Sequence, residues 1–495
     1  KTKSIMHEIN AQKLNTVAWQ FNHSYTKLPK DFFVEQLPVK VSNPKLILLN
    51  EPLLKSLGLD KEALSREAWG NIFSGNELPE KAHPIAEAYA GHQFGHFAIL
   101  GDGRAVLLGE HVNPDGDHFD IQFKGSGQTP YSRRGDGRAA LGPMLREFII
   151  SEAMFALKIP TTRSLAVVMT GESVMRDEVL PGAILTRVAK SHIRVGTFQF
   201  ASTLNDTNKL KALADYTIDR HYPECKAKDN PYLAFLNAVI ERQALLLSQW
   251  MHVGFIHGVM NTDNMSISGE TIDYGPCAFM DRYHPETVFS SIDRHGRYAY
   301  ANQPPIAQWN LARFAETLIP LIDQNTDKSI ELASQSVNDF SDQFQRAWLR
   351  GMRQKLGLFN EGPNNIELIN ELLVLMQKNK ADYTLTFRHL SSDAILKDTI
   401  FKDTSFKVWY KNWIHCIQKQ KEGEETSKLM MLKHNPAVIP RNYLVEKALS
   451  LAVVDQDYRF LNDFIAALLN PYEDSKVFGE PALQEDKSYQ TFCGT

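Results

Sequence analysis

Between residues 96 and 116 the chain alternates short apolar runs with glycine-rich turns, a pattern typical of antiparallel strands. Two apolar runs, 96–100 and 105–110, flank the sequence Gly-Asp-Gly-Arg, which predicts a strand, a tight turn and a second strand. An Asn-Pro-Asp-Gly turn signal follows at 113–116. A dinucleotide-binding domain would place a helix directly after its first glycine turn, so the second strand argues against that fold.

The next apolar residues have the period-two pattern of a strand with one buried face. Phe119, Ile121 and Phe123 alternate with polar residues, the last of which is Lys124. We therefore expect an antiparallel meander in which Lys124 projects from the polar face of the third strand.

A glycine-rich stretch, 125–138, leads into a predicted helix. Apolar residues recur at helical spacing from Leu141 to Ile149. Glu147 lies on the flank of this apolar stripe, where its carboxylate can point toward the sheet. The chain has no GxxxxGK[ST] motif, so a P-loop ATPase is not supported.

From about residue 200 onward, long helical patterns dominate the sequence. We expect helices over the ranges 232–251, 306–322, 336–355, 365–379 and 441–451. Between the first two helices lies a polar, irregular segment, 257–305. Functional residues are often held in such loops on a rigid scaffold. The pattern as a whole predicts an α+β protein that is rich in strands at its N-terminal end and helical afterwards.

The composition is that of a folded protein without a dominant nucleic-acid or membrane partner. The 495 residues include 54 lysines and arginines and 58 aspartates and glutamates, a net charge of −4, which argues against nucleic-acid binding as the main function. No run of about 18 apolar residues predicts a membrane-spanning helix. Residues 1–30 lack the apolar core of a secretion signal, and the four cysteines form no CxxC pair, so we expect a cytoplasmic protein.

The irregular segment contains most of a kinase-like catalytic motif. Kinases use H-x-D-x-x-x-x-N followed by D-x-G, where the first aspartate handles the hydroxyl proton and the other residues bind magnesium. Here His257 and Asn264 are in register and Asp273 begins a D-x-G, but Val259 stands where the catalytic aspartate belongs. Valine cannot accept a proton, so the motif indicates a pseudokinase when read strictly. Asp263, directly before the asparagine, offers a substitute carboxylate.

Together, the predicted lysine, glutamate, asparagine and aspartate indicate a nucleotide site. Oxygen ligands from Asn264 and Asp273 suit Mg²⁺, and Mn²⁺ fits equally well. Residues 121–147 hold five basic side chains against two acidic ones, a local excess of positive charge in an acidic protein. A nucleoside triphosphate requires such a field, and the arginine fork suits phosphate oxygens.

Seven stretches, spread over most of the chain, are similar to one known family. They are GHQFG (91–95), LGDGRAVLLGE (100–110), KGSGQTPYSRRGDGRA (124–139), RVAKSHIRVGTF (187–198), HGVMNTDNMS (257–266), DYGP (273–276) and NQPPIAQWNLAR (302–313). On these motifs the chain resembles the selenoprotein O family of kinase-fold proteins.

The resemblance implies a fold, a reaction and partners. The fold is an atypical protein-kinase-like fold, with a small β-rich N-lobe within residues 1–195 and a large helical C-lobe with a helical extension over residues 196–495. ATP is expected to bind flipped relative to ordinary kinases, so that its α-phosphate faces the acceptor. The reaction implied is transfer of AMP to a Ser, Thr or Tyr hydroxyl of a protein, with release of pyrophosphate. UMP transfer from UTP is also associated with the family, and self-modification is compatible with the same chemistry.

The resemblance also gives each candidate residue a role. The resemblance implies that the nucleotide is contacted from the glycine turn by Gly101, Gly103 and Arg104 and at its far end by Asp136 and Gly137. Lys124, paired with Glu147, is implied to bind phosphates, and Arg187 and Arg194 to clamp the outer phosphates. Asp263 is implied to accept the proton, and Asn264 and Asp273 to bind the metal, with Asp273 also contacting the nucleotide. Many members carry a C-terminal selenocysteine or cysteine thought to bridge to the loop after the D-x-G. Cys493 is the terminal candidate here, and Cys277 lies so close to Asp273 that the same bridge is in doubt.

Other interpretations stay open at this point. One is an ordinary kinase that transfers the γ-phosphate and uses Asp263 as its base, and another is a nucleotide-binding scaffold without turnover. Each candidate also has a structural interpretation: Lys124 as a solvated strand residue, Asp263 as a turn or cap residue. His257 is expected to hold the catalytic loop by hydrogen bonds rather than to transfer protons.

Overall fold

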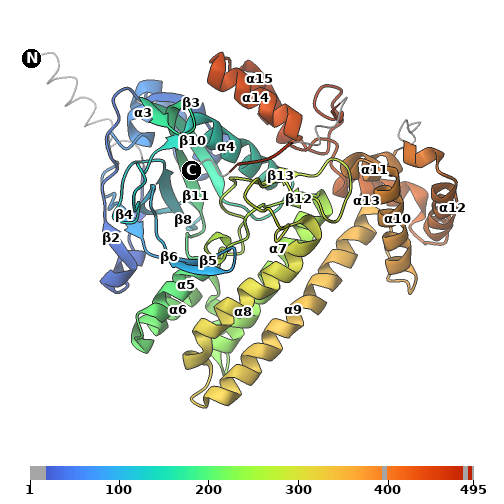
Figure 1. The fold of residues 1–495 in the computed structure, drawn as a ribbon, viewed down its shortest axis with the longest axis horizontal. Coiled ribbons are helices and arrows are strands. Elements are labelled where there is room, and N and C mark those ends of the chain that lie inside the picture. The colour runs from blue at the N-terminus through green and yellow to red at the C-terminus, as the bar shows by residue number, and fades with distance from the viewer. Residues whose placement is uncertain (1–17, 393–398, 483–488, 493–495) are drawn as a thin grey trace, which may run out of the picture.

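The computed structural model describes residues 18–392, 399–482 and 489–492, and it has a mixed α/β architecture. Figure 1 shows a β-rich N-terminal part, in blue and cyan, beside long helices that occupy the rest of the chain. This arrangement confirms the predicted order of a strand-rich region followed by a helical one.

The N-terminal part is built on one large antiparallel sheet with the strand order β2-β4-β7-β8-β11-β10-β3. Two further short strands, β1 and β9, pair with β7 and β11. The strands are β1 (Phe21–Asn22), β2 (Phe33–Glu35), β3 (Lys45–Leu49), β4 (Ile85–Glu87), β7 (Ala105–Val112), β8 (His118–Lys124), β9 (Ala139–Ala140), β10 (Arg163–Met175) and β11 (Val179–Ala189).

The predicted three-strand meander is only partly correct. β7 and β8 pair as expected, but β6 (His96–Ile99) pairs with β5 (Ala90–Gln93) in a separate two-stranded sheet. The glycine turn therefore links two sheets instead of closing a hairpin. Backbone N–H groups at this turn form hydrogen bonds with carbonyls of residues that precede β5. The Leu100 N–H donates to the Tyr89 carbonyl at 2.9 Å, and the Asp102 N–H donates to the Glu87 carbonyl at 2.9 Å.

The prediction that β8 has only one buried face is wrong. Its polar side chains, Asp120, Gln122 and Lys124, are at most 7% exposed. β8 lies between β7 and β11 in the sheet, and its polar face meets buried charged partners from other elements. A strand of this kind keeps the alternating sequence pattern although both of its faces are largely buried.

Helices cover both faces of the sheet. α2 (Glu51–Ser56) and α3 (Arg66–Phe73) enclose a core with the apolar face of β8, whereas α4 (Leu141–Ala156) packs on β10 and β11. α4 matches the predicted helix after the glycine-rich stretch.

The helical part contains all five predicted helices. They correspond to α7 (Pro231–Val253), α8 (Gln303–Ile322), α9 (Thr326–Lys355), α10 (Asn365–Asn379) and α14 (Asn442–Val454). α9 begins ten residues earlier than expected, because Asn325 caps its N-terminus by accepting the Lys328 N–H and the first turns are too polar to show a clear apolar stripe. The remaining α-helices within the described residues are α5 (Val195–Thr203), α6 (Thr207–His221), α11 (Tyr383–Leu390), α12 (Thr404–Gln418), α13 (Gly423–His434) and α15 (Arg459–Leu468).

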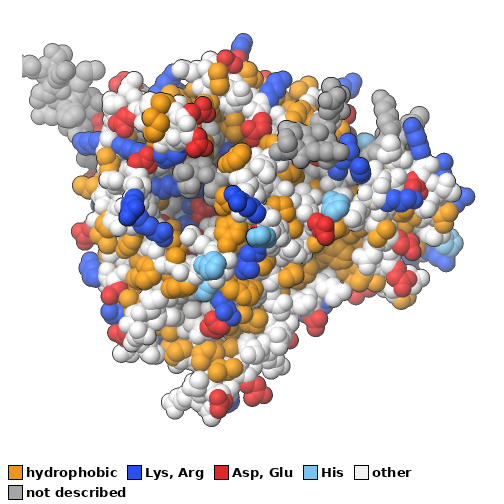
Figure 2. All heavy atoms as spheres, in the orientation of Figure 1, with side chains coloured by type: hydrophobic (Ala, Val, Ile, Leu, Met, Phe, Trp, Pro, Cys, Tyr) orange, Lys and Arg blue, Asp and Glu red, His pale blue; other side chains and the backbone are white. Residues whose placement is uncertain are grey.

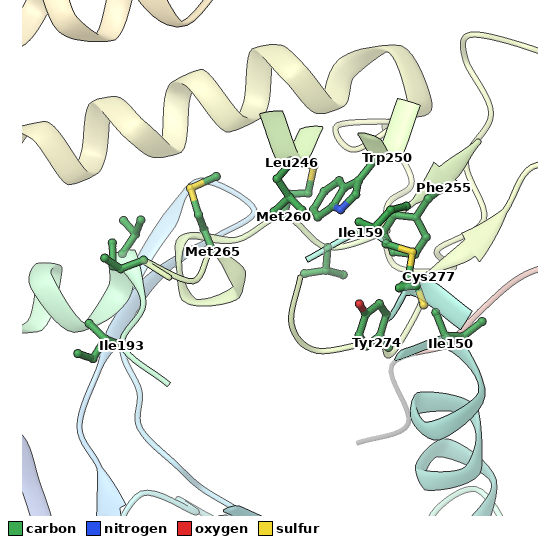
Figure 3. Packing of buried hydrophobic residues seen from close by; sticks show 14 of the residues in the cluster. Ile150, Ile159, Ile193, Leu246, Trp250, Phe255, Met260, Met265, Tyr274 and Cys277 are labelled. Carbon is green, nitrogen blue, oxygen red and sulfur yellow. The ribbon is translucent and has the colours of Figure 1, made fainter. Parts of the chain in front are cut away.

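A short hairpin fixes both ends of the loop that contains the kinase-like motif. α7 ends at Gly254, whose φ of 73° lies in the left-handed region that favours glycine. The chain then forms β12 (Phe255–Ile256), and after the loop it returns as β13 (Ala278–Phe279), which pairs with β12. Figure 3 shows apolar side chains of the loop itself, Met260 and Tyr274 among them, in the same buried cluster as Trp250 of α7. The polar loop is thus held on a rigid apolar base. Within the described ranges, no helix has the length and apolar character needed to span a bilayer.

Candidate active site

A cavity of about 550 Å³ lies between the sheet and the loop. Nine of the predicted site residues line it: Gly103, Arg104, Lys124, Glu147, Arg187, Arg194, Asp263, Asn264 and Asp273. A neighbouring cavity of about 700 Å³ is lined by the other three, Gly101, Asp136 and Gly137. The two cavities share Arg104 and Asp263 in their walls, so the structure brings all the predicted residues to one continuous hollow.

Three cations and two carboxylates form a charged cluster at the centre of the first cavity. Lys124 Nζ donates to Glu147 Oε2 at 2.7 Å, the pairing that the family resemblance implied, and also to Asp273 Oδ1 at 3.2 Å. Arg187 donates to Glu147 Oε1 at 2.6 Å and to Asp273 Oδ1 at 2.6 Å. Arg194 Nη1 donates to Asp273 Oδ2 at 2.6 Å. Both oxygens of Asp273 therefore face cationic donors.

The register of the sheet brings two of these cations together. Lys124 pairs with Leu185 across the ladder and Gln122 pairs with Arg187, so Lys124 and Arg187 project from the same face of neighbouring strands. Arg194 arrives from a different element, since it is the residue before α5, and its backbone N–H donates to the side chain of Thr197 at 3.0 Å. Sheet, helix and loop each contribute a charge to the cluster.

Burial and neighbouring charge oppose one another in this cluster. Burial alone would raise the pKa of Asp273, but Arg187, Arg194 and Lys124 hold the pKa of this carboxyl well below its usual value. Burial likewise works against ionisation of Glu147, yet Arg187 and Lys124 keep its pKa below the usual range. Both carboxylates are therefore ionised at neutral pH. Asp273 has a φ of 63°, an uncommon conformation that aspartate tolerates better than most residues and that is often found at functional sites.

Asp263 is the second carboxylate that faces the cavity, and its environment is different. Its side chain is buried and its Oδ1 atom has no hydrogen-bond partner among the described residues. Burial raises the pKa of Asp263 to about 6, although the charge of Arg194 acts in the opposite direction. A carboxylate with an unpaired oxygen and a raised pKa is well suited to accept a proton near neutral pH.

Two glycines make room for Asp263. A Cβ at Gly91 in β5 would lie 2.9 Å from both Cβ and Cγ of Asp263, and closer still to Oδ1. A Cβ at Gly196 in α5 would collide with the Ala90 carbonyl and lie 3.3 Å from the Asp263 Cα. The loop that contains Asp263 thus approaches β5 and α5 so closely that only glycine fits at these two positions.

The asparagine that follows is suited to bind a metal together with Asp273. Asn264 donates its side-chain N–H to the Val259 carbonyl at 2.9 Å, which leaves the amide oxygen as the atom available to a cation. Among the described residues, no group of three or more His, Cys, Asp or Glu could hold a metal ion alone. Substrate phosphates and water would have to complete the coordination shell, as they usually do for Mg²⁺. The donor set therefore fits a metal that arrives with a nucleotide.

The second cavity is shaped by backbone crossings at glycine. A Cβ at Gly101, whose φ is 147°, would collide with the ring of Tyr131, and a Cβ at Gly137 would collide with the Gly127 backbone. Asp136 is held by Arg176, whose Nη1 donates to Asp136 Oδ2 at 2.8 Å. These glycines are needed for packing of the cavity wall, in addition to any contact with a ligand.

His257 has the structural role that was predicted for it. Its Nε2 lies 2.8 Å from the carbonyl of Ile272, so it connects the two ends of the loop, and burial lowers its pKa. Val259 is buried and lines the cavity. No carboxylate is present at the position where a kinase has its catalytic aspartate.

Comparison with known proteins identifies the family. A family model described as protein adenylyltransferase SelO matches residues 15–469. The protein nucleotidyltransferase YdiU of Bacillus cereus (strain G9842) is 56% identical over 486 residues, which cover 98% of this chain and 100% of the relative. The proteins of the same name from Bacillus cytotoxicus and Bacillus mycoides are also 56% identical, over 98% and 97% of this chain and 99% of each relative.

The chain belongs to the SelO family. The predicted resemblance is confirmed over nearly the whole chain, and with it the enzyme class, protein nucleotidyltransferase.

The SelO-family site includes residues that the sequence alone did not single out. Asp102, inside the glycine turn, lines the cavity, and burial raises its pKa to about 6. Gln122 and Tyr89 also line it, the latter with its ring 4.7 Å from the Arg194 guanidinium. Asp102 lies within one of the matching motifs, and Gln122 lies on the same polar face of the predicted strand as Lys124. These positions were the signals in the sequence that could have identified the two residues.

The C-terminal residues of the described chain reach the edge of the cavity. Thr491 bonds to the backbone on both sides of β13: its N–H donates to the Phe289 carbonyl at 2.8 Å, and its hydroxyl donates to the Pro276 carbonyl at 2.6 Å. Phe492 lines the cavity. Cys277 lies buried directly after Pro276. Cys493, the terminal candidate for the bridge that the resemblance implied, lies outside the described residues.

Proposed function

We propose that this protein transfers AMP from ATP to Ser, Thr or Tyr hydroxyls of proteins, in a metal-dependent reaction that releases pyrophosphate. The observation that supports this most strongly is the separation of two carboxylates in one cavity. Asp273 is held ionised by three cations, whereas Asp263 is buried with an unpaired oxygen and a raised pKa. One carboxylate is suited to the metal and phosphates, and the other to the proton of the acceptor.

The cationic cluster would bind the triphosphate. Lys124, Arg187 and Arg194 now pair with carboxylates, and phosphate oxygens are equivalent partners for them. Gly101, Gly103 and Arg104 would contact the nucleotide from the glycine turn. The other end of the nucleotide would occupy the second cavity, against Asp136 and Gly137.

Asn264 and Asp273 would hold Mg²⁺ or Mn²⁺ through their side-chain oxygens. The bound metal would supply charge neutralisation on the phosphate oxygens. Glu147 would keep Lys124 and Arg187 oriented toward the phosphates, since its two oxygens accept from both.

The transfer step follows from these positions. Asp263 accepts the proton of the acceptor hydroxyl, and the oxygen of that hydroxyl forms a bond to the α-phosphorus. The bond between the α-phosphorus and the oxygen that bridges to the β-phosphate breaks, and pyrophosphate leaves with the electron pair. Lys124 and the two arginines stabilise the charge that develops on the leaving group, so catalysis is mostly positioning plus electrostatics.

We also propose the finer fold assignment, an atypical kinase-like fold with an N-lobe within residues 1–195 and a C-lobe over 196–495. The Lys124–Glu147 pair between a strand and the following helix supports it, as does the metal-binding pair on a loop of the helical part. UTP as a second nucleotide and self-modification are further parts of the proposal.

Parallel labelling reactions test this function. Purified protein with Mg²⁺ or Mn²⁺ receives ATP labelled on either the α- or the γ-phosphate, beside an Asp273→Ala variant and a matched control, Asp463→Ala, which removes an exposed aspartate on α15. Protein-bound label from α-labelled ATP only, lost in Asp273→Ala and kept in Asp463→Ala, is the expected result. Label from γ-labelled ATP only would favour an ordinary kinase, and no label from either would favour a scaffold without turnover.

A further inference from the structure

A second groove opens beside the catalytic cavity, on the side of the loop that follows the D-x-G. It has a volume of about 590 Å³ and shares two lining residues, Phe94 and Ile292, with the catalytic cavity. Its lining residues are Phe94, His96, Ile292, Asp293, Arg294, His295, Arg297, Asn302, Pro305 and Ile306. We call this hollow the lateral groove.

The lateral groove is fastened to the catalytic loop through one side chain. Asn261 Oδ1 accepts the Phe94 N–H at 3.0 Å and the Tyr298 hydroxyl at 2.8 Å. Phe94 lines the groove, and its ring packs against that of the buried Tyr298, with the two ring centroids 5.2 Å apart. Because Asn261 stands two residues before Asp263, a segment bound in the groove would lie in a fixed position relative to the proposed base.

The lateral groove is lined by positively charged side chains that are not paired with a carboxylate among the described residues. Its one acidic residue, Asp293, is buried, and its two oxygens accept the backbone N–H groups of Arg297 and Tyr298, each at 2.8 Å. In the part of the chain that the structure describes, neither Arg294 nor Arg297 forms an ion pair. By contrast, Arg313 packs on the same Trp309 ring as Arg297 and is paired with Glu316 at 2.6 Å.

The position of Arg297 is suited to binding an anion. Its guanidinium lies 5.0 Å from the Trp309 ring, and its buried Nε has no hydrogen-bond partner among the described residues. Arg294 and His295 are exposed beside it, and His96 faces the groove from β6. Figure 2 shows basic and histidine side chains gathered on this face, next to β5 and β6. A cationic arginine that packs on an aromatic ring and has no carboxylate partner is typical of a binding site for an anionic ligand.

Exposed apolar side chains accompany this charge. Ile292 and Phe492, which line the catalytic cavity, are 46% and 67% exposed, and Phe97 and Ile99 on β6 are 47% and 58% exposed. Apolar side chains beside cations suit a protein ligand that brings both apolar and acidic residues.

We propose that the lateral groove binds the acceptor protein through acidic side chains that flank the modified hydroxyl. This inference rests on the proposed function and deepens it, because it names the class of acceptor: Ser, Thr or Tyr in an acidic segment. Arg294 and Arg297 pair with the flanking carboxylates, and the tether through Asn261 sets the hydroxyl against Asp263.

The test compares two acceptor peptides that differ only in charge. Both contain the same hydroxyl residue, one flanked by glutamates and the other by the isosteric glutamines, and kcat/KM for AMP transfer is measured with each. We expect the wild type to prefer the glutamate peptide about five- to tenfold, with the preference falling as salt is raised. In Arg294→Gln and in Arg297→Gln the ratio should fall to below about twofold, whereas Arg346→Gln, which removes an exposed arginine on α9, should keep it.

A charge reversal makes the test independent of folding. Arg294 is exposed, so Arg294→Glu should fold normally and should prefer a peptide flanked by lysines. Equal rates with both peptides in the wild type, or a ratio that none of the arginine variants changes, would overturn the proposal while the AMP-transfer function stands. Absence of any label from α-labelled ATP, on peptide or protein, would instead show that the proposed function has failed. Loss of binding to phosphatidylserine vesicles in the variants, with an unchanged peptide ratio, would assign the groove to a lipid surface and overturn the proposal as well.

Discussion

Replacing Gly91 by alanine should disable the enzyme by displacing one carboxylate. The Cβ of the alanine would lie 2.9 Å from Cβ and Cγ of Asp263, whereas ordinary contacts begin at 3.4 Å and extend to 4 Å. Asp263 would therefore have to move by about 0.5–1 Å, and a misplacement of that size at a catalytic group can cost up to about a hundredfold in rate. Because the φ of Gly91 is not in the left-handed region, the effect is steric and not conformational.

The expected result is a 10- to 100-fold lower kcat for AMP transfer, about 1.4–2.7 kcal/mol, with nearly unchanged ATP affinity. Initial rates with α-labelled ATP and calorimetric titration with ATP measure the two quantities. Gly142→Ala is the matched control, since its Cβ would meet only Val453 Cγ2, at an ordinary 3.8 Å, near the start of α4.

A double-mutant cycle separates this mechanism from general distortion of β5. In an Asp263→Ala background two of the three atoms that the new Cβ would meet are absent. Gly91→Ala should then change the residual rate by less than about twofold, and its cost in stability, about 1–3 kcal/mol for overpacking, should shrink. The same fold loss in both backgrounds would refute the reasoning, because it would mean that the alanine acts through something other than Asp263.

Three further predictions concern stability and metal binding. Lys355 is buried against Phe387 and burial lowers its pKa to about 7 from 10.5, so Lys355→Met should stabilise the protein at pH 7 by up to about 5 kcal/mol, at roughly 1.4 kcal/mol per pH unit. Between pH 7 and 10.5 the unfolded state binds more protons than the folded state, so the wild type should become more stable as the pH rises through that window. The difference in unfolding free energy between wild type and variant, measured by urea unfolding, should therefore shrink, and a difference that stays constant would contradict this. Arg441 is fully buried between Asp281 and Asp382, so Arg441→Leu should lower the free energy of unfolding by about 3–5 kcal/mol, which an unchanged urea midpoint would disprove. EDTA should abolish AMP transfer and Mn²⁺ should restore it, while electron paramagnetic resonance should detect only weak Mn²⁺ binding until ATP is added; tight binding without nucleotide would count against a metal site completed by phosphates.

Patterns along the chain predicted two of the elements that meet at the site, but not β11 and α5, which position Arg187 and Arg194. The alternation before Lys124 and the apolar stripe beside Glu147 predicted a strand and a helix whose charged residues face each other, and these side chains lie 2.7 Å apart. The same alternation could not tell that the polar face is buried. A polar residue that meets buried opposite charges has the same local sequence as one that meets water, so only the long-range partners, such as Arg187, distinguish the two.

Other features depend on contacts that no local pattern encodes. The strand β6 is short, and its choice of β5 over β7 is made by a two-residue turn and by backbone bonds from the glycine turn to residues before β5. The need for glycine at Gly91 arises from a loop far away in the sequence. Motif similarity identified that position as part of a matching stretch, but its physical reason is visible only in three dimensions.

The pairing of Asp273 with three cations has a consequence for turnover. Asp273 is a counter-anion to Lys124, Arg187 and Arg194 that the protein itself supplies. In the proposed reaction, an arriving triphosphate would replace this carboxylate as the partner of the three cations, and after pyrophosphate leaves the cations could pair with the carboxylate again. This internal competition would weaken the binding of pyrophosphate and favour its release. The same residue would therefore bind the metal during the reaction and help to clear the site after it.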